Sequence, residues 1–125
     1  MTGVQTCALP ISIFGTAGIP VYSATKHAVR GLTEALSIAF KRYGVRAADL
    51  LPGLISDTVR AMAPTEGYWR LVQPVEVAET VWRAYHEDKL HWYIPEDLRD
   101  FHAQVVNEPE VVREERTALL AAMTQ

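Results

Sequence analysis

One long amphipathic segment, followed at once by a glycine and a short apolar run, limits what this chain can fold into. Over residues 21–43, apolar side chains recur at spacings of three and four, which predicts a helix of about that length. The apolar stripe consists of Val29, Leu32, Leu36, Ala39 and Tyr43. Lys41, Arg42 and then Gly44 are typical of a helix end. Residues 45–51 read as a strand, so the segment predicts an α/β protein with a parallel sheet.

A second stripe on the same predicted helix is made of small side chains. Its members are Ala24, Ala28, Gly31 and Ala35. A glycine inside a helix costs about 1 kcal/mol relative to alanine, so its presence calls for a packing reason. Small side chains allow close approach, and this stripe predicts contact with a neighbouring helix or sheet.

The remaining segments extend the α/β pattern towards the C-terminus. Residues 12–20 read as a strand end and a Gly/Pro loop. Pro74 opens a helix whose apolar face is predicted to carry Val77, Ala78, Val81, Trp82 and Tyr85. Residues 91–94 are strand-like, Pro95 starts a further helix, and residues 107–110 open the last one.

Composition excludes several classes of function. A length of 125 residues suits one domain, and a net charge of −3 gives no reason to expect nucleic acid or an anionic membrane as a partner. No apolar run approaches the roughly 18 residues that span a bilayer, which predicts a soluble chain. The four histidines and the single cysteine lack the spacing of a metal site, so no metal is predicted.

The first eleven residues are expected not to belong to the natural protein. Thr2 to Ile11 match, residue for residue, the translation of a common sequencing-library adapter. Segments of this origin are set aside before a fold is considered. We therefore divide the chain into a non-native leader, residues 1–11, and a single domain, residues 12–125, from which the upstream part is missing.

The chemistry of the chain is expected at the start of the long helix. Tyr22 and Lys26 are four residues apart, so the phenol and the ammonium group share one helical face. A nearby ammonium and the positive end of a helix both favour the phenolate, which makes Tyr22 a general acid/base. Spacing alone is weak, because such a pair arises by chance in about one chain of this composition in eight.

The sequence around this pair resembles the active-site helix of the short-chain dehydrogenases/reductases. The residues that carry the resemblance are Gly15, Gly18, Pro20, residues 22–29 (Tyr-Ser-Ala-Thr-Lys-His-Ala-Val), Gly31 and Leu32. Downstream, residues 43–46 and residues 51–58 look like the next segment of the same family. The resemblance is specific over about residues 13–58 and looser to about residue 95. It implies the C-terminal half of a Rossmann-like, doubly wound parallel sheet.

The resemblance also implies a function. The residue that matches Tyr22 exchanges the hydroxyl proton while hydride passes between NAD or NADP and an alcohol or carbonyl carbon. The residue that matches Lys26 holds the nicotinamide ribose and assists the tyrosine. The cofactor contacts implied are Tyr22, Lys26, Pro52, Gly53, Ile55 and Thr58. Such an enzyme is expected to be a cytoplasmic homo-oligomer, a dimer or a tetramer, acting on a small molecule whose identity the sequence does not give.

The sequence departs from the family's pattern at three points and contains one segment that varies within the family. The family's catalytic serine would fall on Leu9, inside the leader, and Ser12 is too close to Tyr22 to replace it. The glycine-rich phosphate loop is not present in the sequence, and Thr58 lies one residue later than the family's usual threonine. Residues 59–73 match the variable substrate loop, where Tyr68, Trp69 and Leu71 are candidate substrate contacts. The fragment alone is therefore expected to be inactive.

Two alternatives stay open. Sugar-nucleotide epimerases and dehydratases share the Tyr-x-x-x-Lys pair, although they usually carry a larger C-terminal region. The chain could instead be a non-catalytic helical interaction module that uses the small-residue stripe. The reading frame upstream of Ser12 discriminates between them, because a glycine-rich strand-turn-helix there would support the oxidoreductase.

Overall fold

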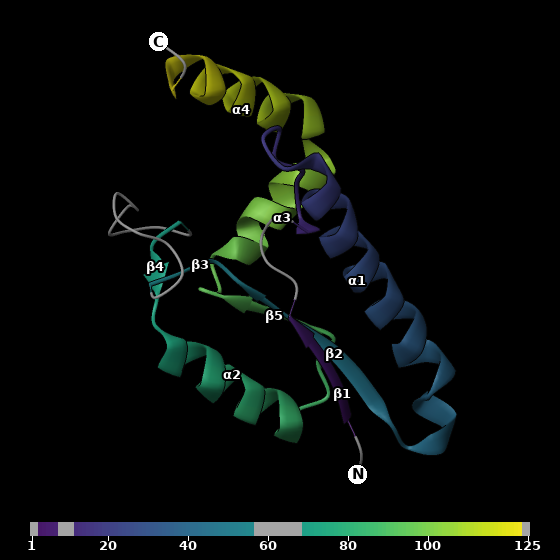
Figure 1. Cartoon of the computed structure of the whole chain (residues 1–125). Helices are drawn as coiled ribbons and strands as arrows, with labels where there is room; N and C mark the ends of the chain where they lie inside the picture. The colour runs from purple at the N-terminus through teal and green to yellow at the C-terminus, as the bar shows by residue number, and fades with distance from the viewer. Residues whose placement is uncertain (1–2, 8–11, 57–68, 124–125) are drawn as a thin grey trace.

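The centre of the molecule is a parallel sheet with helices on both faces (Figure 1). The computed structural model describes residues 3–7, 12–56 and 69–123. Parallel strands joined through helices require crossover connections, which the alternation of helix and strand in this sequence supplies. The α/β class with a parallel sheet is confirmed.

The helices and strands have the following bounds. In chain order they are β1 (Gly3–Cys7), α1 (Pro20–Ala39), the 3₁₀ turn η2 (Lys41–Tyr43), β2 (Arg46–Pro52), β3 (Leu54–Ile55), β4 (Leu71–Val72), α2 (Pro74–His86), β5 (His91–Ile94), α3 (Leu98–Asn107) and α4 (Pro109–Met123). The main sheet has the order β1-β2-β5, and β3 pairs with β4 in a second, two-stranded parallel sheet.

The long helix begins one residue before its predicted start, and its regular part ends four residues before the predicted end at Tyr43. Pro20 occupies the first turn, where the missing N–H costs nothing. The regular helix ends at Ala39 and the chain continues as the 3₁₀ turn η2. Gly44 then has a φ of 72°, the left-handed conformation that favours glycine after a helix. This tight ending lets β2 begin two residues later.

The face that α1 buries only partly matches the predicted one, in which Val29 packs half-buried against the core around Leu51 and Leu36 is half-buried. The buried residues are Ser23 and Thr33, whereas Leu32 is exposed. Each buried hydroxyl is satisfied locally, because Ser23 Oγ donates to the Ile19 carbonyl and Thr33 Oγ1 donates to the Val29 carbonyl. A hydroxyl bonded to its own helix can be buried at little cost, and a pattern based on apolar residues misses it.

The small-residue stripe of α1 also does not make the close contact that the sequence predicted. Ala24, Ala28, Gly31 and Ala35 are all exposed. A Cβ added at Gly31 would meet nothing within 4 Å. The close contact expected for this stripe is therefore wrong for the described residues, and the stripe forms an open surface.

Helix α2 begins where predicted but is rotated relative to its predicted face. Gln73 and Glu76 form a reciprocal capping box, and Arg70 binds the Glu76 carboxylate at 2.7 Å. The helix buries Thr80 and Ala84, with Val77 partly buried. The predicted members Ala78, Val81, Trp82 and Tyr85 are exposed. Alanine allows the helix to approach the sheet closely, and Thr80 Oγ1 donates to the Glu76 carbonyl, so this narrower face packs better.

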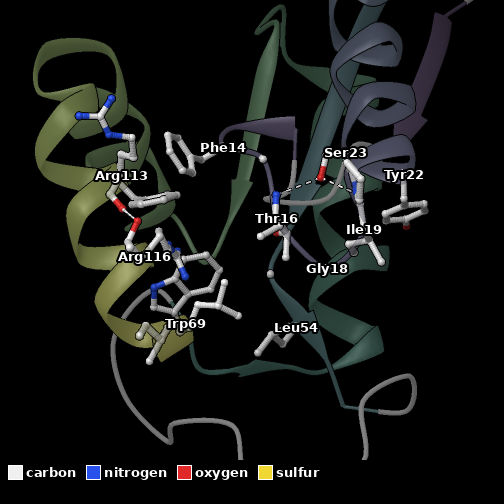
Figure 2. A pocket seen from close by; sticks show the side chains of 18 of the residues that line it. Phe14, Thr16, Gly18, Ile19, Tyr22, Ser23, Leu54, Trp69, Arg113 and Arg116 are labelled. Carbon is white, nitrogen blue, oxygen red and sulfur yellow. Dashed lines mark hydrogen bonds between the residues drawn. The ribbon is translucent and has the colours of Figure 1, made fainter. Parts of the chain in front are cut away.

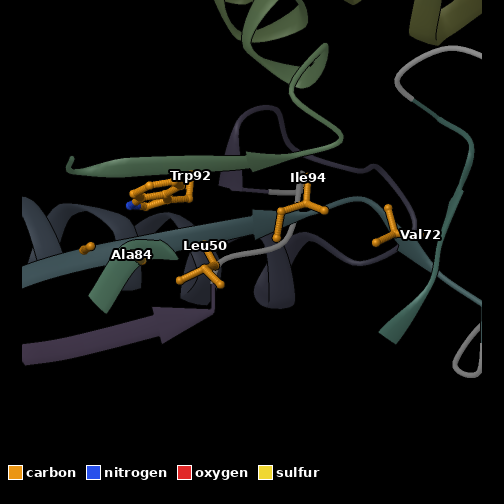
Figure 3. Close-up of a cluster of buried hydrophobic side chains, with 6 residues drawn as sticks. Leu50, Val72, Ala84, Trp92 and Ile94 are labelled. Atoms are coloured by element: carbon orange, nitrogen blue, oxygen red, sulfur yellow. The ribbon is translucent and has the colours of Figure 1, made fainter. Parts of the chain in front are cut away.

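The two faces of the sheet carry separate cores. On the α2 side, Trp92 and Leu50 pack with Ala48, Val72, Ala84 and Ile94 (Figure 3). On the other side, Leu51 packs with Ile13, Phe101 and Val112. Neighbouring residues of β2 point to opposite faces, which explains why Leu50 and Leu51 belong to different cores. The latter core joins the sheet to α3 and α4.

The last two helices follow the predicted order. A turn from Pro95, whose carbonyl accepts from the Leu98 N–H at 3.1 Å, precedes α3, which starts three residues later than predicted. Pro109 opens α4, as the sequence predicted.

The N-terminal segment forms an edge strand of the main sheet. Residues 3–7, which we expected to stand outside the fold, pair as β1 with β2 in parallel, from Gly3 opposite Arg46 to Cys7 opposite Leu50. Backbone groups supply all the hydrogen bonds of a ladder, so a pairing of this kind does not depend on the origin of the sequence. The expectation that residues 1–11 are a non-native leader stays a prediction.

A network of polar side chains lies between α1 and the sheet. Asp49 is fully buried, and its Oδ1 lies 2.8 Å from His91 Nδ1, while Glu34 approaches the other ring nitrogen at 3.6 Å.

A second polar pair is formed by Tyr93 and His102, whose hydroxyl and Nδ1 are hydrogen-bonded at 2.6 Å. Burial lowers the pKa of His102 below its ordinary value of 6.5, and Arg30 and His91 act in the same direction. The folded protein therefore favours the neutral form of His102.

This pKa predicts a loss of stability in mild acid. Below about pH 6.5 the unfolded chain takes up a proton at His102 that the folded chain binds less readily, so the free energy of unfolding falls as the pH drops. Urea unfolding at pH 7.5 and pH 5.5 should show a smaller drop in the His102→Gln variant, whose amide can still accept a hydrogen bond from Tyr93. Equal drops in both proteins would contradict this origin.

Candidate functional site

A cavity of about 810 Å³ opens beside the start of α1. Its walls come from four parts of the chain: the loop before α1 with the first turn of that helix, the segment after β2, Trp69 with α3, and α4 (Figure 2). Most of the lining side chains are apolar, including Phe14, Ile19, Leu54, Trp69, Phe101, Leu119 and Leu120. A concave, largely apolar cavity with a few polar groups is the usual form of a small-molecule site.

Ser23 fixes the loop that forms one wall. Its Oγ accepts a hydrogen bond from the Thr16 N–H and donates to the Ile19 carbonyl, both at 3.0 Å. The side chain is buried, so these bonds are shielded from water. The loop is thereby tied to the first turn of α1, from which Tyr22 projects.

Tyr22 and Lys26 are brought together as their spacing predicts. Tyr22 lines the cavity and is 40% exposed. Lys26 Nζ lies 5.4 Å from the centre of the Tyr22 ring, so the two side chains are on the same side of α1. Tyr22 thus lines the cavity with the Lys26 ammonium beside its ring, and Lys26 itself is not among the lining residues.

The segment after β2 meets the same cavity. Gly53 and Ile55 line it together with Tyr22. The Gly53 N–H donates to the Ile94 carbonyl at 2.7 Å, which anchors this turn to β5. Pro52 is buried as the last residue of β2 and is not among the lining residues. Tyr22, Gly53 and Ile55 thus line the same cavity, Lys26 lies beside the Tyr22 ring, and Pro52 directly precedes Gly53 in the chain.

Not all the predicted contacts can be located. Thr58 and Tyr68 lie outside the described residues. Trp69 lines the cavity and packs edge-on against Phe101, with ring centres 5.3 Å apart. Leu71 belongs to β4 and is not among the lining residues. Of the three predicted substrate contacts, one has the position expected of it.

The sequence reasoning missed the wall contributed by α4. Arg113, Arg116, Thr117 and Leu120 line the cavity. Their spacings of three and four place them on one face of the last helix, a signal that was available in the sequence. From the sequence alone, this spacing did not indicate a site. The face with the arginines is directed towards the cavity because Val112, on another face of α4, packs into the core around Leu51.

The described residues contain neither a metal site nor a membrane-spanning helix. Within residues 3–7, 12–56 and 69–123, no group of three or more His, Cys, Asp or Glu side chains is arranged to hold a metal ion. Over the same part of the chain, no helix is long and apolar enough to cross a membrane.

Comparison with known proteins shows what this chain is similar to. The family model described as short chain dehydrogenase matches residues 10–68, which include Tyr22, Lys26 and Gly53. Curated relatives named 3-alpha-(or 20-beta)-hydroxysteroid dehydrogenase, from Mycobacterium bovis and Mycobacterium tuberculosis, are 34% identical over 71 residues. The match covers 54% of this chain and 27% of each relative.

Solved structures show the same fold. A short chain dehydrogenase from Burkholderia cenocepacia, in complex with NADP, has a TM-score of 0.76 at 16% identity over 91% of this chain and 46% of its own. A short-chain dehydrogenase from Streptomyces avermitilis has a TM-score of 0.67 at 20% identity over 98% of this chain and 52% of its own. The chain thus spans about half the length of the structures it resembles. Residues 10–68 are thus similar in sequence to the short chain dehydrogenases, and the described part of the chain shares the fold of these solved structures.

Proposed function

We propose that this chain is part of an oxidoreductase that transfers hydride between NAD or NADP and an alcohol or carbonyl substrate. The observation that carries the proposal is the placement of Tyr22 on the cavity wall with the Lys26 ammonium 5.4 Å from its ring. Both the hydroxysteroid dehydrogenases and the NADP-bound relative support this reaction type. The matching relatives are dehydrogenases, which favours hydride transfer over the epimerase alternative.

The residues of the cavity fit the nicotinamide end of such a cofactor. Gly53 and Ile55 line the cavity together with Tyr22. Lys26 does not line it, but its ammonium lies next to the Tyr22 ring and can donate hydrogen bonds to the ribose hydroxyls of a cofactor bound there. Thr58 is proposed as a further contact on the carboxamide side. When bound, the cofactor supplies or accepts the hydride.

Tyr22 performs the proton transfer in this proposal. As a carbonyl carbon is reduced, its oxygen gains negative charge and the Tyr22 hydroxyl gives up its proton to it. Lys26 stabilises the Tyr22 phenolate that remains. In the reverse direction, when an alcohol is oxidised, this phenolate accepts the hydroxyl proton of the alcohol. The walls of the cavity are largely apolar, Leu54 and Ile55 among them, and a substrate that fills the cavity would displace water and strengthen these interactions.

We also propose that the 125 residues alone turn over substrate negligibly. The sequence contains no G-x-G-x-x-G motif, which in dinucleotide-binding folds receives the diphosphate at a helix N-terminus. Oxidation of NADH and NADPH should be followed with a panel of ketones and aldehydes. The chain should be compared with a protein extended by the reading frame upstream of Ser12.

The extended protein is expected to oxidise one of the two cofactors and the 125-residue chain neither. Turnover by the chain alone that disappears in the Lys26→Met variant, but not in the Lys41→Met control, would contradict the proposed inactivity while supporting the site. An extended protein that binds neither cofactor would overturn the proposed reaction.

A further inference from the structure

Exposed apolar side chains gather at the cavity beside Tyr22. Ile19, Leu119 and Leu120 line it, and each is about half exposed. Ile19 directly precedes α1 and the two leucines belong to α4, so the fold brings together residues from opposite ends of the chain. Apolar side chains that converge on a concave surface while still exposed are typical of a place that a ligand covers.

The polar groups on the α4 side of the cavity are engaged within the protein. Thr117 Oγ1 donates to the Arg113 carbonyl at 2.9 Å, and Arg113 Nη2 lies 3.2 Å from Glu114 Oε1. The guanidinium carbon of Arg116 lies 4.4 Å from the centre of the Trp69 ring, on which it stacks. The surface that this wall offers to a ligand is therefore mainly aliphatic and aromatic.

The wall at the start of α1 is different. The hydroxyl groups of Tyr22 and Thr16, which both line the cavity, form no hydrogen bond with any residue in the described part of the chain. Each can therefore donate a hydrogen bond to an oxygen atom of a ligand. The cavity thus has a polar end at Tyr22 and an apolar end at α4 and Trp69.

These two ends face each other across the cavity: Figure 2 shows Tyr22 on one wall and Trp69 with Arg116 on the opposite one. We propose that the substrate is a compact apolar compound of several fused rings, with the reacting alcohol or carbonyl group at one end and no polar group at the other. The reacting oxygen lies at Tyr22, and the ring system covers the apolar side chains of α4. This inference rests on the proposed function and adds the class of substrate.

Size and desolvation both support this class. A volume of about 810 Å³ lies in the upper part of the range of about 300–1,000 Å³ that is usual for small-molecule sites, which leaves room for a ring system beside a nicotinamide. A polar group at the remote end of the substrate would lose its water at the α4 wall without gaining a partner, and this loss disfavours its binding.

The test measures binding alone, so that it does not depend on turnover. The ¹⁵N-labelled chain is titrated with cyclohexanone, 2-decalone and 6-hydroxy-2-decalone, and chemical shifts are followed by NMR. 2-Decalone is expected to bind at least about tenfold more tightly than cyclohexanone, because its second ring also leaves water. The remote hydroxyl of 6-hydroxy-2-decalone should weaken binding about tenfold relative to 2-decalone.

Variants at two matched leucines make the result specific. Leu119→Gln places an amide on the apolar wall, so the preference for 2-decalone over its hydroxyl derivative should fall to about one. Leu119→Ala adds no polar group and should weaken both decalones by the same factor. Leu32→Gln is the control, because Leu32 is exposed to a similar extent on α1 and does not line the cavity. It should change neither affinity by more than about twofold.

Three results would overturn the proposal. The first is equal affinity of the parent chain for 2-decalone and its hydroxyl derivative, and the second is the same loss in Leu32→Gln as in Leu119→Gln. The third is a change of the ligand-free shifts at Ile19 and Leu119 on dilution, which would show that a second copy of the chain fills the cavity. Absence of turnover in the extended protein, with the preference for 2-decalone intact, would contradict only the hydride-transfer proposal.

Discussion

Replacing Tyr22 by phenylalanine is expected to lower the rate of hydride transfer by about 10²–10⁴-fold in the extended protein, the usual contribution of a general acid/base. The ring stays beside Lys26, and only the hydroxyl that moves the proton is lost. A decrease confined to kcat would indicate that substrate still binds in the cavity. The measurement is the initial rate of NADH or NADPH oxidation under saturating substrate.

Tyr43→Phe is the matched control for this prediction. Tyr43 is 64% exposed, lies in η2 and does not line the cavity. The same atom is removed, and the rate should stay within about twofold because surface changes of this kind have small effects. If both variants lose activity equally, or if Tyr22→Phe keeps full activity, Tyr22 is not the acid/base.

The largest effect on stability is expected for Trp92→Ala, which should reduce the free energy of unfolding by about 3–5 kcal/mol. Trp92 is only 2% exposed and fills the core between the sheet and α2 (Figure 3). Its Nε1 also donates to the Lys89 carbonyl at 2.9 Å. Removing the ring leaves a cavity that a packed sheet cannot close. Urea unfolding followed by circular dichroism measures the change.

Trp82→Ala removes an identical side chain from the surface of α2. Trp82 is 67% exposed and contacts mainly Tyr85 and His86 on its own helix. We expect a change of no more than about 1 kcal/mol. Trp82 belongs to α2, and Trp92 of β5 packs beneath the same helix. If Trp82→Ala lowers the free energy of unfolding as much as Trp92→Ala does, the loss comes from weakening α2 and not from removing the ring in the core.

The candidate site was partly accessible from the sequence because its first part is local. Tyr22 and Lys26 lie one helical turn apart, so their spacing alone places them on the same side of α1. Gly53 joins them because the turn that follows a parallel strand lies at the edge of the sheet where ligands bind in such folds. Arg116 could not be assigned, since its position depends on how α4 packs across about ninety residues of intervening chain.

The sequence by itself predicted the succession of α1, β2, α2, β5, α3 and α4, the glycine at position 44 that ends the helical segment after α1 and η2, and the pairing of Tyr22 with Lys26. Each of these depends on interactions between residues a few positions apart. Only the tertiary structure decided which face each helix buries. Thr33 and Thr80 point inwards because their hydroxyls bond within their own helices, while Leu32 and Trp82 remain exposed. The shape of the sheet selects the side chains that fit against it, and hydrophobicity along the chain contains no record of that shape.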